Sequence, residues 1–156
     1  MNTHAEQDIH AIGWLLAVSD MERSTRFYCE GLGFGVGQTA ERGDEAAGTL
    51  ELDSCKFQLR FLARPDARLM LMQLLEPSPL GDKARKSARE LGPLSMSFTC
   101  PSPAETAARL AALGGTLVHH GRTASGKADL SLVTDPDGFR VELVSAPIDA
   151  VRLMFA

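Results

Sequence analysis

The sequence predicts an α+β fold made of two modules, each with a strand, a helix and three further strands. Each half opens with a short apolar stretch suited to a strand, then shows a helix-capping signal and an apolar helical face. The second half is also a shifted copy of the first, because moving it by 82 positions places Gly13 on Ser95 and Asp20 on Ser102. Internal repetition of this kind is typical of folds built from one supersecondary unit and its copy.

In the first half, the apolar run Gly13 to Val18 predicts the opening strand. Either Ser19 or Asp20 can cap the helix that follows, and Ser19 with Glu22 would make a capping box. One apolar face of this helix comprises Met21, Thr25, Tyr28 and Leu32. Three strands are then expected at 49–52, 56–63 and 69–75, after a polar loop at 37–48.

In the second half, alternation predicts a strand over Leu94 to Thr99. Ser102, Pro103 and Glu105 form a strong helix start, with a cap, a proline at the first helical position and a box-closing glutamate. Strands are expected at 116–119, 129–134 and 139–144. The last two flank Asp135-Pro136-Asp137-Gly138, whose proline and glycine are typical of a hairpin turn.

These elements divide the single domain 1–156 into module one at about 8–78, a linker at about 79–92, module two at about 93–146 and a C-terminal tail at 147–156. The linker contains the charged segment 81–91 and can hold a helical turn. Because Asp82 and Glu90 interrupt its positive charge, we expect a solvated connection rather than a binding patch.

Composition excludes several function classes. The net charge of −4 gives no basic footprint for nucleic acid, and no apolar run is long enough to suggest a membrane span. Residues 1–10 lack the layout of a signal peptide. The cysteines, Cys29, Cys55 and Cys100, are odd in number and widely spaced, which favours buried thiols in a reducing compartment over a disulfide framework or a zinc knuckle. We therefore expect a cytoplasmic protein.

Two motifs stand out in the chain. The first joins the segment 18–24 to Phe27-Tyr28 and Leu32-Gly33-Phe34, and the second is Asp135-Pro136-Asp137-Gly138 followed by a strand that carries Glu142. Together, in this order and at this spacing, they resemble the vicinal oxygen chelate (glyoxalase/bleomycin-resistance/dioxygenase) superfamily. The resemblance covers roughly residues 10–145 and implies two βαβββ modules whose curled mixed sheets form a shared cleft. In this family the cleft often holds a divalent metal, and two chains commonly pair. The resemblance therefore implies a homodimer, which would also cover exposed sheet edges.

The resemblance also locates four metal-ligand positions, two in each module. Gly13 stands at the first, Gln73 is assigned to the second from its spacing to Glu76-Pro77, and Ser95 and Glu142 stand at the third and fourth. Glycine offers no donor and only Glu142 is a strong ligand, so the usual metal site is largely lost. We expect no cofactor, with a divalent metal as the alternative. In that case His10, His119 or His120 would replace a lost ligand.

Strand alternation assigns side chains to the cleft or to the helix side. The inward set is Gly13, Leu15, Ala17, Leu69, Leu71, Gln73, Leu75, Ser95, Ser97, Thr99, Arg140, Glu142 and Val144. The set behind it is Trp14, Leu16, Val18, Met70, Met72, Leu74, Met96, Phe98, Cys100, Val141 and Leu143. Trp14 is expected to be a buried anchor under the helix. Arg140 and Glu142 either contact a ligand or form a structural ion pair.

This inward set predicts an apolar pocket with a few polar groups, as in small-molecule sites. The expected ligand contacts are Gly13, Leu15, Leu71, Gln73, Ser95, Ser97, Arg140 and Glu142, and Glu142 is the candidate catalytic residue. The leading hypothesis is metal-free binding of a small organic molecule, with or without catalysis. One alternative is a metal-dependent lyase, isomerase, epimerase or ring-cleaving dioxygenase. Another is a non-enzymatic dimeric protein that acts through its surface.

Overall fold

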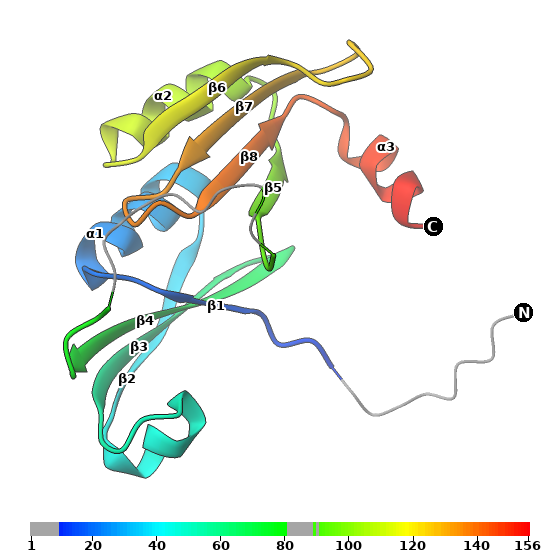
Figure 1. Cartoon of the computed structure of the whole chain (residues 1–156). Coiled ribbons are helices and arrows are strands. Elements are labelled where there is room, and N and C mark those ends of the chain that lie inside the picture. Colours follow the sequence, from blue (N-terminus) through cyan, green and yellow to red (C-terminus); the bar gives the residue numbers. More distant parts are fainter. Residues whose placement is uncertain (1–9, 81–88, 90) are drawn as a thin grey trace, which may run out of the picture.

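A computed structural model describes residues 10–80, 89 and 91–156 (Figure 1). Two mixed four-stranded sheets form the fold, which confirms the α+β class and the two βαβββ modules. The first sheet has the order β1-β4-β3-β2, with β1 at Trp14–Ala17, β2 at Gly35–Arg42, β3 at Lys56–Arg64 and β4 at Ala67–Glu76. The second has the order β5-β8-β7-β6, with β5 at Ser95–Thr99, β6 at Thr116–Arg122, β7 at Asp129–Thr134 and β8 at Arg140–Val144.

Helices follow the first strand of each module. Helix α1 spans Met21–Arg26 and continues as the π-helical turn η1 at Phe27–Gly31, whereas α2 spans Pro103–Ala112. The tail holds α3 at Ile148–Arg152 and the short 3₁₀ turn η3 at Leu153–Phe155. Among the described residues, no helix has both the length and the apolar character needed to span a membrane.

The prediction of a strand at 49–52 and a loop at 37–48 is wrong. The chain instead forms β2 at Gly35–Arg42, followed by the 3₁₀ helix η2 at Asp44–Leu50. Strand β2 is an exposed edge strand with two glycines and a bulge between Val36 and Thr39, so it lacks the apolar alternation that marks a strand in a sequence. Most of the predicted linker segment, 81–88 and 90, lies outside the described residues.

The caps of α1 and α2 follow the sequence signals only in part. Asp20 is the cap of α1, and its carboxylate accepts from the Arg23 amide at 2.9 Å. Ser19 is thereby left to bind the second module. Ser102 stands at the cap of α2 with Pro103 behind it, but the Ser102 side chain makes no capping hydrogen bond. The proline, which needs no amide partner, contributes to this helix start.

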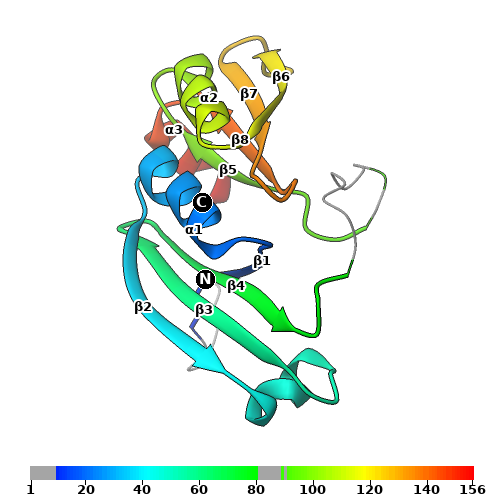
Figure 2. The same ribbon diagram turned by 90° about the vertical axis from the view of Figure 1, so that its left-hand side faces the viewer.

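One hydrophobic core joins the two modules. Phe27 and Tyr28 after α1 and Leu110 of α2 are fully buried together with side chains from β4, β7 and β8. Figure 2 shows α1 between the first sheet and α2, so the side of each sheet that bears helices faces inward. We call this side the helix face and the opposite side the open face. Each fully buried aliphatic or aromatic side chain contributes about 1.5–3 kcal/mol.

The faces of β4 are the reverse of those predicted. Leu69 and Leu71, at 1% and 0% exposure, lie in the shared core, whereas Met72 and Leu74 pack with Phe57 against the segment 44–52. The strand is apolar at nearly every position, so alternation alone cannot fix its phase. Leu71 and Gln73 are therefore on the helix face, and the prediction that they line a cleft is wrong.

Gln73 has a different place in the structure. Its side-chain oxygen accepts a hydrogen bond at 2.8 Å from the backbone amide of Met21, the first residue of α1. The first amides of a helix have no partner within the helix, so Gln73 satisfies one that Asp20 does not reach. This bond ties β4 to the beginning of α1.

The prediction that Trp14 is a buried anchor is also wrong, because its exposure is 60%. It shares the helix face with Leu16 and Val18, which do pack into or against the core. However, Trp14 stands at the first residue of an edge strand, whereas the core begins two residues later.

The hairpin turn at 135–138 fastens the second module to α1 of the first. The Tyr28 hydroxyl donates to the Asp135 carboxylate at 2.8 Å. Asp137 accepts from the Ser19 amide at 3.0 Å, from the Ser19 hydroxyl and from the Arg23 guanidinium at 3.3 Å. We call these contacts the module latch. Burial raises the pKa of Asp135 above its ordinary value of 3.8, although bonds from Tyr28 and two backbone amides lower it in part.

This raised pKa predicts a pH-dependent effect of Asp135→Asn. The folded protein holds a proton on Asp135 more tightly than the unfolded chain does, so the contribution of Asp135 to stability is largest in acid and falls as the pH rises through the raised value. The free energy of unfolding of Asp135→Asn, measured in urea from about pH 4 to pH 7, should rise relative to wild type over that range. Asp149→Asn, in the exposed helix α3, is the control. A free energy of unfolding of Asp135→Asn that falls relative to wild type as the pH rises would contradict the prediction.

A second prediction concerns the Gln73 contact. Gln73→Leu should lower the free energy of unfolding by about 1 kcal/mol, because the Met21 amide loses its partner. The matched control is Gln58→Leu, where the lost bond is an exposed one to Glu41 and the expected change is within about 0.5 kcal/mol. Equal effects of the two changes would show that the Gln73 contact adds nothing.

Candidate functional site

The open face of the second sheet carries the polar side chains predicted for the site. Strand pairing aligns them in three rows across β5, β8, β7 and β6. The first row is Ser95, Arg140, Thr134 and Thr116. The second is Ser97, Glu142, Leu132 and His119, and the third is Thr99, Val144, Leu130 and Gly121. Ser95, Ser97, Arg140 and Glu142 thus share one face, and their role in binding stays a prediction.

Glu142 and Arg140 do not pair with each other in the described structure. The Glu142 carboxylate accepts from the Ser97 hydroxyl at 3.1 Å. The Arg140 Nε is buried and has no hydrogen-bond partner. The structural ion pair considered for these two residues is therefore not formed, and each keeps hydrogen-bonding capacity on the open face.

The open face of the first sheet is apolar at its centre, and the exposed Arg68 lies on the same face next to Gly13. Leu15 and Phe61 are 49% and 38% exposed, and Met70 lies between them in the register of the strands. Within the described part of the chain, the segment 44–52 covers one end of this face by packing on Phe57 and Leu74. Sequence reasoning placed Met70 on the helix side because it gave β4 the opposite phase, and it assigned no face to Phe61 on β3.

Strand register also identifies the module-one counterpart of Glu142. In the second sheet Ser97 pairs with Glu142, and in the first sheet the equivalent Leu15 pairs with Met70. Met70 rather than Gln73 therefore stands at the fourth-strand position of module one. A thioether is a soft ligand, poorly suited to the hard divalent ions that carboxylates bind.

The residues present do not fit the metal that the family resemblance implies. Gly13 has φ = +142°, and a Cβ built there would lie 2.8 Å from the backbone oxygen of Arg68. A histidine at this position would require the strand to shift, because backbone atoms cannot give way as a flexible side chain does. Of the residues at the four positions, Gly13, Met70, Ser95 and Glu142, only Glu142 is a strong donor.

The histidines considered as substitutes are dispersed. His10 is exposed near the start of the described chain. His120 lies on the helix face, where its Nδ1 is 2.8 Å from the Ser131 hydroxyl. His119 is on the open face in the row of Glu142, and its ring lies over Gly121. Among the described residues, no group of three or more His, Cys, Asp or Glu side chains is placed to hold a metal ion.

One hollow of about 320 Å³ is bordered by Gly13 and Arg68, next to the beginning of β1, and two others lie near the helices. The first of these two, of about 340 Å³, is bordered by Gly31, Arg64, Cys100 and Arg109, near the junction of the modules. Its arginines already donate to the backbone oxygens of Leu32 and Gly31. The second, of about 370 Å³, lies between α1 and the end of α2. Neither of these two contains a residue predicted for the site.

Comparison with known proteins identifies the family. Residues 9–143 match the family described as Glyoxalase/Bleomycin resistance protein/Dioxygenase superfamily. No curated protein sequence gives a significant match. The fold is shared with a glyoxalase family protein from Bacillus cereus, which is 22% identical with a TM-score of 0.78, over 90% of this chain and 96% of that one.

Two further solved structures have related folds. Glyoxalase I from Leishmania major, described as trypanothione-dependent, is 18% identical with a TM-score of 0.63, over 94% of both chains. The fosfomycin resistance protein FosX from Listeria monocytogenes, complexed with Mn(II) and sulfate, is 16% identical with a TM-score of 0.58, over 90% of this chain and 94% of that one. At these identities the structures show the fold alone. The family match, which covers most of the sequence, shows that the chain belongs to the Glyoxalase/Bleomycin resistance protein/Dioxygenase superfamily.

Proposed function

We propose that this protein binds a small organic molecule between the open faces of two different chains, without a metal. The observation that carries the proposal is the contrast between these faces. The first is apolar around Leu15, Phe61 and Met70, whereas the second presents Arg140 and Glu142 with free hydrogen-bonding capacity. An apolar wall opposite a few placed polar groups is the usual composition of a small-molecule site.

A second chain is needed because the two open faces of one chain point away from a common core. Tyr28 and Leu110 fill that core between the helix faces, and the module latch fixes the arrangement. We infer a homodimer in which the first sheet of one chain lies opposite the second sheet of its partner. Exposed apolar side chains at the edge strand β1, including Ile12 at 75% and Trp14 at 60%, support pairing there.

The residues at the four metal-ligand positions, rather than membership of the family, support binding without a metal. The Listeria protein is complexed with Mn(II), and a metal of that kind can polarise substrate oxygens as a Lewis acid. Here the four equivalent positions hold one carboxylate, one hydroxyl, one thioether and one glycine that cannot accept a side chain without a clash. We assign Glu142 a role as ligand anchor or general base, held by Ser97.

Two alternatives make different demands. A metal-dependent lyase, isomerase or dioxygenase would need donors beyond Glu142, and His119 is the histidine that shares its row. A non-enzymatic interaction protein would need no ligand between the open faces. We further propose a cytoplasmic location, supported by three cysteines that form no disulfide.

Binding can be tested with a neutral apolar fluorophore, N-phenyl-1-naphthylamine. The wild-type protein should bind it saturably, with unchanged affinity in EDTA, and elemental analysis should find far less than one divalent metal per chain. Met70→Lys, on the open face of the first sheet, should abolish binding because it places a charge on the apolar wall. Leu153 lies in the C-terminal tail and is 76% exposed. Leu153→Lys is therefore the matched control and should bind the fluorophore as wild type does.

The possible results separate the proposals. Loss of binding in EDTA together with near-stoichiometric metal would favour the metal-dependent enzyme. Absence of saturable binding would favour the interaction protein. Equal binding by Met70→Lys and Leu153→Lys would place the ligand elsewhere on the molecule.

The dimer can be followed through the single tryptophan of the chain. Trp14 is 60% exposed in one chain, so burial at an interface should shift its fluorescence emission to shorter wavelength than that of the urea-unfolded protein. Light scattering should give twice the mass of one chain at micromolar concentration. Dilution should return the emission to longer wavelength. A monomer in light scattering with concentration-independent emission would refute the dimer.

A further inference from the structure

We propose that the ligand is a monoanionic amphiphile, an apolar molecule with one carboxylate-type or sulfonate-type group, and that Arg140 binds this group. This inference rests on the proposed function and adds to it a ligand class and an orientation. It is carried by the hydrogen bonds of Arg140 and by the order of side chains on the open face of the second sheet.

Arg140 differs from the other arginines that the structure describes. Its guanidinium group makes no hydrogen bond or ion pair with the described residues, and its Nε is nevertheless buried. Arg23 and Arg60 also bury an Nε, but their terminal nitrogens bind Asp137 and Glu22. A buried charged donor without a partner is costly, so an anionic partner from outside the chain would relieve that cost.

The neighbours of Arg140 favour an anion at this end of the face. Its row contains Ser95 and Thr134 on the adjacent strands and Thr116 beyond. Ser95 and the buried Thr134 thus flank Arg140, and the Ser95 hydroxyl can donate to an anion that a planar guanidinium holds through two nitrogens. Glu142 belongs to the next row.

Polarity falls along the strands away from Arg140. The row of Glu142 is mixed, with Leu132 and His119 beside Ser97. The following row contains the apolar Val144 and Leu130. This order predicts that the anionic group lies near the hairpin turn at 135–138 and that the apolar body extends toward the β6–β7 tip, facing the apolar wall of the partner chain.

Glu142 restricts the charge of the ligand. It lies two residues from Arg140 on the same face of β8, which is about 7 Å along a strand. One positive and one negative side chain leave no net charge, so a monoanion gains from Arg140 with limited repulsion from Glu142, whereas a dianion meets more repulsion. A donor group next to the acid would also find an acceptor in Glu142.

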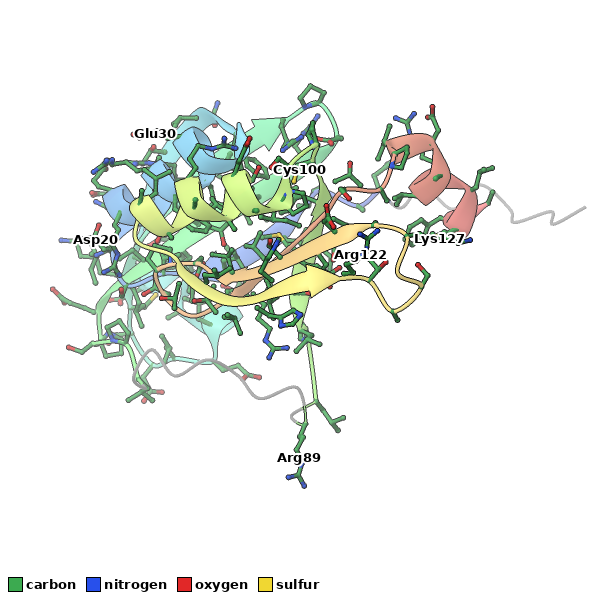
Figure 3. The ribbon with its side chains drawn as sticks, turned by 90° about the horizontal axis from the view of Figure 1, so that it is seen from above. Asp20, Glu30, Arg89, Cys100, Arg122 and Lys127 are labelled. Atoms are coloured by element: carbon green, nitrogen blue, oxygen red, sulfur yellow. The ribbon has the colours of Figure 1, made fainter. Side chains whose placement is uncertain are left out.

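Two dyes of similar shape test the role of Arg140. 1-Anilinonaphthalene-8-sulfonate carries one anionic group beside an N–H, and N-phenyl-1-naphthylamine is its neutral counterpart. Arg140→Gln should weaken binding of the sulfonate about tenfold and leave the neutral dye unchanged. Arg122→Gln is the matched control, because Arg122 lies on β6 toward the β6–β7 turn, where it already binds the Gly126 carbonyl (Figure 3). It should bind both dyes as wild type does.

The charge limit is tested by competition at about pH 8, where a phosphate monoester is a dianion. 1-Naphthalenesulfonate should displace the anionic dye from wild type better than 1-naphthyl phosphate does. Glu142→Gln should narrow this difference, because it removes the repulsion of the second charge. This competition experiment does not need the Arg140→Gln variant, so it still tests the inference if that variant fails to fold.

The outcomes for the inference and for the proposed function differ. If the neutral dye binds and Arg140→Gln changes the affinity for both dyes equally little, Arg140 does not bind the anionic group. The proposed small-molecule site would then still stand. If 1-naphthyl phosphate competes better on wild type and Glu142→Gln changes nothing, the monoanion limit is wrong. If neither dye binds the wild type, the proposed function fails first and the inference fails with it.

Discussion

The packing of both helices into one core is the constraint on which the rest of the structure depends. Tyr28 fills that core with its ring and reaches the second module with its hydroxyl, which donates to Asp135. The Asp137 carboxylate then accepts hydrogen bonds from the Ser19 amide and the Arg23 guanidinium at the beginning of α1. Hydrophobic burial favours contact between the helix faces, and these directional bonds fix how they meet. Because the helix faces are used inside the chain, the open faces are directed outward.

This arrangement separates two chemical tasks that the family resemblance places around one cleft. The first sheet offers an apolar open face around Leu15 and Met70, and the second offers a charged one around Arg140 and Glu142. Neither face alone resembles a small-molecule site, since the first is mostly apolar and the second lacks apolar cover. In the proposed homodimer, a second copy would bring the two faces together. Dimerisation and ligand binding are therefore expected to be coupled, because any ligand that touches both faces binds only the paired state.

The sequence determined the parts of the fold that local chemistry specifies. The repeat, the two helices and the turn at 135–138 follow from capping residues, glycines and alternation, and so does the face of Glu142, because β8 alternates polar with fully buried residues. Alternation could not place Gln73, since β4 is apolar at nearly every position and its phase depends on which side the helix packs. Strand β2 was missed for the opposite reason. It is exposed along most of its length and is stabilised by pairing with β3. The local sequence contains no pattern that predicts this pairing. Trp14 shows that apolar character alone does not bury a residue on an edge strand.

The misfit between this chain and the metal that the family resemblance implies involves the backbone as well as the side chains. A missing ligand could in general be restored by one substitution, but Gly13 has a positive φ and its Cβ direction leads to the Arg68 carbonyl at 2.8 Å. The strand has taken a course that only glycine follows without strain. Ser95, the equivalent position in module two, does not have this steric limit. A histidine at Ser95 would nevertheless find only Glu142 as a second strong metal ligand. The open face of the second sheet instead carries a carboxylate near a guanidinium that has no partner among the described residues. A pair of opposite charges binds polar molecules through hydrogen bonds and charge, and this is chemistry that a fold of this family can carry out without a metal.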